Sequence, residues 1–289
     1  METKISIILP AKNEARNLPA LLKEITGLYP DAEVILVDDG SSDNTAAIAT
    51  EHGALVFKHP YSLGNGAAIK SGAQHASGDI LVFMDADGQH DPKDIPRLID
   101  TLNSGYDMVV GARNAGSQAS IGRGLANGFY NRLASYMAGQ QIKDLTSGFR
   151  AVRANKFYEF IYLLPNGFSY PTTITMAFFR AGYIIAYLPI TAGKREGKSH
   201  LRPIRDGIRF LLIIFRIATL YSPLKIFVPM SGGFFALGFG YLLYTLISQS
   251  RFSNMSALLL ITSILIFLIG LVSEQITQLI YKSSNSNKL

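Results

Sequence analysis

The chain has 289 residues, of which 48% are hydrophobic and 17% are charged, and its formal net charge is +6. That apolar content excludes an intrinsically disordered chain, which combines few apolar residues with high charge. The chain contains no cysteine, which excludes disulfide bonds, thiolate metal sites and a cysteine nucleophile. The apolar residues concentrate after about residue 204, so a front part of ordinary polarity precedes an apolar tail.

The front part alternates short apolar runs with stretches of helical periodicity. The apolar runs predict buried strands at Ile5–Leu9, Val34–Asp38, Ala54–Lys58, Ile80–Met84 and Met108–Gly111. The periodic stretches predict helices around Ala15–Thr26, Thr45–His52, Ala67–Ala76 and Ile95–Ser104. This alternation with short connections predicts an α/β domain whose parallel sheet is covered on both faces.

Polar residues follow three of the predicted strands, where ligands of such sheets bind. The three runs are Pro10-Ala11-Lys12-Asn13-Glu14, Asp38-Asp39-Gly40-Ser41 and Asp85-Ala86-Asp87-Gly88-Gln89-His90. Asp38 and Asp39 are suited to accept hydrogen bonds from ribose hydroxyls and from a base edge. Asp85 and Asp87 are suited to a divalent cation, because paired carboxylates repel each other without one. Mg²⁺ and Mn²⁺ prefer oxygen ligands and commonly bridge to a substrate diphosphate.

Other nucleotide and metal motifs are absent from the sequence. There is no Gly-x-x-x-x-Gly-Lys-Ser/Thr phosphate loop, and Gly64-Asn65-Gly66 lacks the third glycine of a dinucleotide fingerprint. The five histidines show no paired zinc spacing.

Basic residues concentrate immediately before the apolar tail. Between Lys194 and Lys225 there are eight basic and two acidic residues, which accounts for the whole net charge. A basic cluster beside a membrane span is attracted to anionic head groups by about 1 kcal/mol per charge, so this position favours lipid over nucleic acid. Residues 203–225 therefore predict a basic amphipathic helix in the membrane surface. The alternatives are a solvated basic face and a helix packed on the front domain.

The tail predicts two membrane spans. No charged residue occurs in the 25 residues from Ile226 to Ser250 or in the 22 from Phe252 to Ser273, and a span needs about 20 apolar residues. Residues 226–282 thus predict a hairpin with spans at about 226–249 and 254–276. The positive-inside rule then predicts a plasma-membrane protein with residues 1–225 and both termini in the cytoplasm.

Small residues recur at four-residue intervals in the first span, at Gly232, Ala236 and Gly240. Such spacing permits close helix packing, including a homo-oligomer. The alternative is that glycine is simply common in membrane helices.

The polar runs after the strands resemble the family 2 glycosyltransferases of GT-A fold over roughly residues 4–200. Within that family, three runs resemble the polyprenyl-phosphate hexose synthases, the group that includes dolichyl-phosphate mannose synthase. They are Asp85–His90, Ser147-Gly148-Phe149-Arg150 and Arg195-Glu196-Gly197-Lys198-Ser199. The resemblance implies that residues 1–202 form a cytosolic catalytic domain.

The resemblance also implies an activity and its residues. The activity is transfer of a hexose, with inversion, from a GDP- or UDP-linked sugar to dolichyl or undecaprenyl phosphate. Donor contacts are implied for Pro10, Asn13, Glu14, Asp38, Asp39, Asp85, Arg195 and Ser199. Asp87 and Gln89 would bind Mg²⁺ or Mn²⁺, and Arg113, Arg123 and Asn127 would bind the lipid phosphate. Asp85, Asp87, Arg113 and Arg123 would be the catalytic residues.

This sequence departs from the family pattern at three places. Asn65 stands where many relatives carry lysine, and Asn127 stands where a serine is frequent. Many soluble relatives have an acidic base near Tyr170–Thr173, and here that segment has none. A hydroxyl acceptor needs such a base, whereas a monophosphate, with its second pKa near ~6, is already mostly dianionic at neutral pH.

Three other functions are alternatives to this one. A transferase acting on another lipid, such as a diacylglycerol, would need a base, for which Asp144 is the candidate. A processive polysaccharide synthase carries a Gln-x-x-Arg-Trp signature, and this chain has no tryptophan. A catalytically inactive membrane scaffold is disfavoured by the intact Asp85-x-Asp87 pair.

Overall fold

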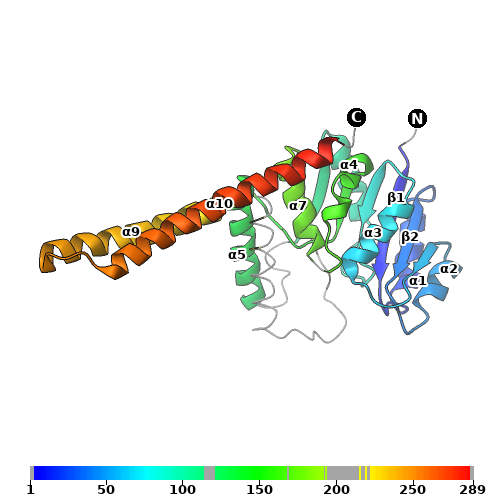
Figure 1. Cartoon of the computed structure of the whole chain (residues 1–289). Helices are drawn as coiled ribbons and strands as arrows, with labels where there is room; N and C mark the ends of the chain where they lie inside the picture. Colours follow the sequence, from blue (N-terminus) through cyan, green and yellow to red (C-terminus); the bar gives the residue numbers. More distant parts are fainter. Residues whose placement is uncertain are drawn as a thin grey trace. The chain divides into compact units, whose positions relative to one another are not determined.

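The computed structural model describes residues 3–113, 121–167, 169–191, 193, 215, 219 and 222–286. The chain forms two compact units, Met1–Leu201 and Arg202–Leu289. The first is an α/β domain and the second contains a hairpin of two long helices (Figure 1). The predicted amphipathic helix within 203–225 lies almost entirely outside the described residues, as do Arg195 and Ser199.

One sheet of seven strands, in the order β3-β2-β1-β4-β6-β5-β7, forms the centre of the first unit (Figure 1). The strands are β1 (Ile5–Ala11), β2 (Glu33–Asp38), β3 (Leu55–Lys58), β4 (Ile80–Phe83), β5 (Met108–Arg113), β6 (Arg150–Arg153) and β7 (Ile185–Ile190). All five strands predicted from apolar runs are present. The strands β3, β2, β1 and β4 are parallel neighbours, as predicted.

The prediction of a wholly parallel sheet is wrong at β6. This strand runs antiparallel to both β4 and β5, and its first residue, Arg150, pairs with Phe83 on one side and Val110 on the other. Its sequence, Arg-Ala-Val-Arg, contains no apolar run that would have predicted a strand. Because β6 is antiparallel, it begins at the edge of the sheet where β4 and β5 end. The start of β6 therefore faces the same region as the carboxyl ends of its neighbours.

Helices cover both faces of the sheet. They are α1 (Leu18–Leu28), α2 (Thr45–Glu51), α3 (Asn65–His75), α4 (Asp94–Asn103), α5 (Ile121–Ala138), α6 (Ala154–Tyr158), α7 (Tyr170–Arg180) and the 3₁₀ helix η2 (Ile161–Leu163). Ile7 of β1 packs in one buried cluster with Leu22 of α1 and Leu98 of α4. The next residue, Ile8, points to the opposite face and contacts α3 at Gly72. This alternation is what a buried strand requires.

The second unit contains α9 (Leu224–Gln249) and α10 (Asn254–Ser286), which lie side by side (Figure 1). Leu224–Gln249 and Asn254–Leu279 are 26 residues each, long and apolar enough to cross a membrane by length and composition. These two helices suggest a membrane hairpin at the place where the sequence predicts one.

Small residues at seven-residue intervals form the contact between α9 and α10. The buried residues are Ser231, Gly238 and Thr245 on α9 and Ser256, Ser263, Gly270 and Thr277 on α10. The Ser231 hydroxyl donates to the Ser263 carbonyl at 3.0 Å, and the Ser263 hydroxyl donates to the Ser231 carbonyl at the same distance. An interval of seven is the repeat of a coiled-coil seam, and small residues allow the backbones to approach closely.

The four-residue set predicted from the sequence lies elsewhere on α9. Gly232, Ala236 and Gly240 are exposed within the described chain, and no atom lies within 4 Å of a Cβ built on Gly232 or Gly240. This set therefore does not hold α9 against α10, and its role in a homo-oligomer stays a prediction.

Candidate active site

A cleft of about 410 Å³ lies at the carboxyl ends of β1, β2 and β4. Its lining residues are Pro10, Ala11, Lys12, Glu14, Asp39, Ser62, Gly64, Asn65, Ala68, Asp85, Ala86, Asp87, Gln89, Thr146, Gly148, Tyr170 and Pro171. Six residues predicted for the donor or the metal are among them: Pro10, Glu14, Asp39, Asp85, Asp87 and Gln89. This volume is within the range of small-ligand pockets, about 300–1,000 Å³.

Asp39 holds one wall of the cleft in place through four hydrogen bonds. Its Oδ2 accepts from the Ser62 hydroxyl at 2.7 Å and from the Gly64 N–H at 3.0 Å, and its Oδ1 accepts from the Leu63 N–H at 2.8 Å. The fourth donor is Nδ1 of His59, 2.8 Å from Oδ1. Burial alone would raise the pKa of Asp39, but the hydrogen bonds from His59 and Ser62 outweigh it and lower the pKa. Asp39 is thus a charged group with its main acceptor positions filled.

His59 is a residue that the sequence analysis missed. Because a carboxylate only accepts hydrogen bonds, Nδ1 carries a proton and donates it to Asp39, and Nε2 lies 2.9 Å from the Ser71 hydroxyl. His59 directly follows β3, so the rule that identified polar residues after the other strands would also have identified it.

Asn13 and Asp38 do not line the cleft, although the sequence predicts donor contacts for both. Asn13 adopts a left-handed backbone, with φ of 58°, and its Oδ1 accepts from the Ser42 N–H at 2.8 Å. Asp38 is buried, and its Oδ1 accepts from the Ser41 N–H at 2.8 Å. Both side chains therefore order the loop that follows β2.

The turn after β4 brings the predicted metal residues together. Asp85, Asp87 and Gln89 all line the cleft, and the Gln89 N–H donates to Asp87 Oδ1 at 3.1 Å. The Asn65 amide donates to Asp85 Oδ1 at 3.3 Å from the opposite wall. Among the described residues, no three His, Cys, Asp or Glu side chains are grouped to hold a metal ion by themselves.

This donor set fits Mg²⁺ or Mn²⁺ that is shared with a substrate. Such ions take oxygen ligands, and Mg²⁺ is usually bound by one or two carboxylates together with substrate phosphates and water. Asp87, Gln89 and Asp85 supply two carboxylates and one amide oxygen in the cleft wall. The remaining ligands would then come from the diphosphate of the donor.

His90 lies beneath this turn and is buried. Its ring stacks on Phe149, with the centroids 5.0 Å apart, and its Nε2 is 4.0 Å from Asp85 Oδ2. Burial lowers the pKa of His90 to about 4, although the charge of Asp87 acts in the opposite direction. His90 is therefore a neutral, packed side chain at pH 7.

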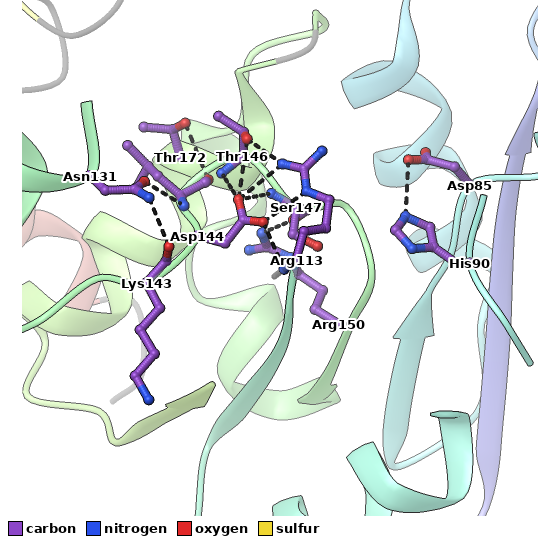
Figure 2. A network of polar contacts seen from close by, with 11 residues as sticks. Asp85, His90, Arg113, Asn131, Lys143, Asp144, Thr146, Ser147, Arg150 and Thr172 are labelled. Atoms are coloured by element: carbon purple, nitrogen blue, oxygen red, sulfur yellow. Dashed lines mark hydrogen bonds and ion pairs between the residues drawn. The ribbon is translucent and has the colours of Figure 1, made fainter. Parts of the chain in front are cut away.

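Arg113, at the end of β5, is held by Asp144 (Figure 2). Its Nε donates to Asp144 Oδ2 at 2.8 Å and its Nη2 to Oδ1 at 3.0 Å, and Nη2 also donates to the Thr146 hydroxyl at 2.6 Å. The hydrogen bonds that Arg113 donates to Asp144 raise the pKa of Arg113. Within the described residues nothing accepts a hydrogen bond from Nη1, and 29% of the side chain is exposed. Arg113 is outside the lining of the cleft, but Thr146, to which it donates, is part of that lining. Its guanidinium thus keeps one end without an acceptor beside the cleft.

Asp144 has no free acceptor position. Besides Arg113, the backbone N–H groups of Thr146 and Ser147 donate to its Oδ1, each at 3.1 Å. Burial raises the pKa of Asp144, but hydrogen bonds and charge from Arg113 outweigh this and lower it. A carboxylate with a lowered pKa and filled acceptor positions is a weak proton acceptor.

The loop that carries Asp144 is hydrogen-bonded to α5 (Figure 2). The Asn131 amide donates to the Lys143 carbonyl at 2.7 Å, and its Oδ1 accepts from the Leu145 N–H at 3.0 Å. The predicted acceptor residues Arg123 and Asn127 belong to the first turns of α5, but their side chains lie outside the described part of the chain. Asn131 follows Asn127 by one helical turn, and the sequence analysis missed it.

Comparisons with known proteins agree with this geometry. Residues 6–160, just over half of the chain, match Glycosyl transferase family 2. Residues 222–279 match the GtrB C-terminal hairpin. The chain is 30% identical over 250 residues to the glycosyltransferase AglJ of Haloferax volcanii, covering 83% of this chain and 80% of that protein.

Solved structures of low sequence identity share the fold. Glucosyl-3-phosphoglycerate synthase of Mycobacterium tuberculosis with phosphoglyceric acid has a TM-score of 0.61 at 22% identity, covering 75% of this chain and 80% of that chain. The same enzyme with Mn²⁺, uridine diphosphate and glucosyl-3-phosphoglycerate has a TM-score of 0.60 at 23% identity, with the same shares covered. The first unit therefore has the GT-A fold, and the mixed sheet belongs to it. The chain is a glycosyltransferase and belongs to Glycosyl transferase family 2.

Proposed function

We propose that this protein transfers a hexose from a nucleotide sugar to a polyprenyl phosphate at the cytoplasmic face of the plasma membrane, with inversion and with Mg²⁺ or Mn²⁺. The observation that carries the proposal is the pair of Arg113 and Asp144. Asp144 binds two nitrogens of the Arg113 guanidinium and leaves Nη1 without an acceptor among the described residues, and its own lowered pKa makes it a weak proton acceptor. Such a site suits an anion that attacks without losing a proton.

The chemistry of the acceptor explains this arrangement. A phosphate monoester has its second pKa near ~6, so at neutral pH it is mostly a dianion with a free nucleophilic oxygen. It needs positioning and partial charge neutralisation, for which the planar fork of arginine is suited. A lipid hydroxyl, as in a diacylglycerol, would need a base. The filled acceptor positions and lowered pKa of Asp144 make it unsuited to that role.

Residues that line the cleft are proposed to hold the donor. Pro10, Glu14 and Asp39 would contact the nucleoside, directly or through the loop that Asp39 orders, and Asp85 would contact the sugar or diphosphate. Asp87 and Gln89 would hold the metal ion, which supplies charge stabilisation for the departing nucleoside diphosphate when bound. The chain's own residues would form the wall against which the diphosphate lies.

Each segment of the chain has a place in this proposal. Residues 1–202 would be the catalytic domain, 203–225 a basic segment in the membrane surface, and 226–282 the hairpin in the bilayer. Arg123 and Asn127 would join Arg113 on the lipid phosphate, and Arg195 and Ser199 would reach the donor diphosphate. One segment supports a membrane-bound acceptor: its two helices are long and apolar enough to cross a membrane, and it matches the GtrB C-terminal hairpin.

A transfer assay with the full-length protein in lipid nanodiscs tests the proposal. The assay compares polyprenyl phosphate, the same polyprenol without phosphate, and diacylglycerol, each with radiolabelled GDP- and UDP-sugars. We expect product only from polyprenyl phosphate, and loss of that product when EDTA removes divalent ions. Transfer to polyprenol or to diacylglycerol at a similar rate would contradict the phosphate acceptor.

A further inference from the structure

Arg150, the first residue of β6, is completely buried, with 0% exposure. Charged side chains are rarely buried to this extent unless they are paired. In the described part of the chain, no carboxylate lies within ion-pair distance of its guanidinium. Arg150 instead donates hydrogen bonds to uncharged acceptors, so its burial requires an explanation other than an ion pair.

The oxygen acceptors of Arg150 lie on two separate segments, and the Met108 Sδ on β5 is a third, weaker acceptor 3.8 Å from Nη1. Nη2 donates to the Ser147 carbonyl, in the loop before β6. Nη1 donates to the Pro171 carbonyl and to the Thr175 hydroxyl, each at 3.2 Å, in the first turns of α7. The guanidinium carbon also lies 5.8 Å from the centre of the Tyr170 ring. Arg150 therefore joins the loop before β6 to α7, on the face of the sheet that α7 covers.

The loop that Arg150 holds connects the two sides of the site. At one end Asp144 binds Arg113, and the Ser147 N–H donates to Asp144. At the other end Gly148 packs against the turn after β4 that carries Asp85, Asp87 and Gln89. A Cβ on Gly148 would lie only 3.0 Å from Asp85 Oδ2. The Ser147 carbonyl, which Arg150 binds, lies between these two contacts in the chain. Any shift of that carbonyl would move Arg113 relative to Asp85.

We propose that Arg150 is a positioning residue that sets the distance between Arg113 and the turn after β4 by holding the Ser147 carbonyl against α7. It acts through the loop at residues 144–148 and touches no substrate. The inference rests on the proposed function, because its measurable effect is on use of the phosphate acceptor. A misplacement of about 1 Å between reacting groups can cost about 10²-fold in rate.

The chemistry of arginine suits this role. Its rigid planar fork can bind acceptors on two segments at once, which the single ammonium of lysine cannot do in the same geometry. Burial lowers the pKa of Arg150, while the charges of Asp144 and Asp85 act in the opposite direction. The nearby carboxylates thus offset part of the cost of burying the charge without contacting it.

The test is the variant Arg150→Lys, with Arg153→Lys as its matched control. Arg153 lies at the other end of the same strand and also donates to two backbone carbonyls, those of Tyr106 and Leu102, away from the cleft. We expect Arg150→Lys to raise the KM for polyprenyl phosphate and lower kcat, reducing kcat/KM about tenfold, with the KM for the nucleotide sugar within about twofold of wild type. Arg153→Lys should leave all three constants unchanged.

Thermal unfolding of both variants separates positioning from loss of fold. The same KM and kcat for polyprenyl phosphate in Arg150→Lys and Arg153→Lys, or an equal rise in both substrate KM values, would overturn the inference.

If Arg150→Lys does not fold, the variant Thr175→Val tests the inference instead, because it removes one acceptor on α7 and leaves both carbonyl contacts. A rise of about threefold in the acceptor KM supports the inference, and no change overturns it. Failure of the wild-type protein to use polyprenyl phosphate would instead refute the proposed function, and this inference with it.

Discussion

The two halves of the sheet contribute to the site in different ways. In the parallel half, β2 and β4 end at the cleft, and the residues just after them, Asp39 and the Asp85 turn, line it directly. In the mixed half, β6 begins where β5 ends, so the loop before β6 faces the last residue of β5. Asp144, from the loop, binds Arg113, from the strand end.

This difference has a chemical consequence. The parallel half gathers acidic groups that would share a metal ion with the donor. In the mixed half the charged group is the Arg113 guanidinium, which is paired with Asp144, and the acceptor positions of Asp144 are filled. In the proposed function, antiparallel insertion of β6 would allow one sheet to hold an anionic donor through a metal ion and an anionic acceptor through Arg113. Variants in each half should therefore affect different substrates.

The largest effect is expected in the parallel half, at Asp87. Asp87→Asn keeps an acceptor for the Gln89 N–H but removes the charge, so metal-dependent kcat/KM should fall by about a thousandfold or more. Titration with Mn²⁺ in the transfer assay measures it. Asp91→Asn is the control, because Asp91 is exposed in the same segment and outside the cleft lining. Unchanged activity of Asp87→Asn in chelator would remove the metal from the proposal.

A smaller effect is expected in the mixed half, at Arg113. Arg113→Lys keeps the charge beside Asp144, but lysine cannot contact both Asp144 and a phosphate in the same geometry. The KM for polyprenyl phosphate should rise about thirtyfold, while the KM for the nucleotide sugar stays unchanged. Arg97→Lys, at an exposed pair with Asp94, is the matched control. A rise in the donor KM alone would reverse the assignment of the two halves.

Asp144→Asn should lower acceptor kcat/KM by about tenfold, because Arg113 loses its charged partner but keeps uncharged ones. A loss of about a thousandfold in kcat would instead indicate a general base and a hydroxyl acceptor. Asp107→Asn, which weakens the Lys156 pair next to the start of β5, controls for loss of an ion pair.

The same variant has a predicted pH dependence of stability. The pKa of Asp144 is lower in the folded chain, so its charge stabilises the fold above the ordinary aspartate pKa, near ~4. That contribution is lost as the pH falls from about 4 through the lowered pKa. The difference in thermal midpoint between wild type and Asp144→Asn should therefore be constant near pH 7 and shrink below about pH 4. A difference that grows on acidification would contradict the lowered pKa.

The smallest effect is expected at His59. His59→Phe removes one of four hydrogen bonds to Asp39, so the loop at Ser62–Gly64 keeps its other three contacts. The KM for the nucleotide sugar should rise about threefold, with the acceptor KM unchanged. His75→Phe, at an exposed histidine that stacks on Phe57, is the control. An altered acceptor KM in His59→Phe would show that the two halves are coupled here.

Much of the site could be predicted because it follows parallel strands. Asp39 and the Asp85 turn come directly after apolar runs, and that position alone places them at one edge of a sheet. Asn13 and Asp38 were predicted by the same rule, but their side chains bond to neighbouring backbone and do not line the cleft. Strand position fixes where a residue lies, whereas its partners decide which way its side chain points.

The helix hairpin shows the same division. Long uncharged runs were sufficient to predict two helices, because length and composition decide whether a helix can cross a membrane. The packing seam at Ser231, Gly238 and Ser263 was not predicted, since each helix carries several sets of small residues and only contact between the helices distinguishes them.

By itself, the sequence determined the alternating strands and helices, the acidic runs after β2 and β4, and the two apolar helices, all of which depend on residues close together in the chain. Only the tertiary structure decided that β6 enters the sheet antiparallel, that Asp144 binds Arg113, and that Arg150 is buried between a loop and α7. These features join segments more than 20 residues apart, and their energies come from pairing and burial that no local pattern encodes.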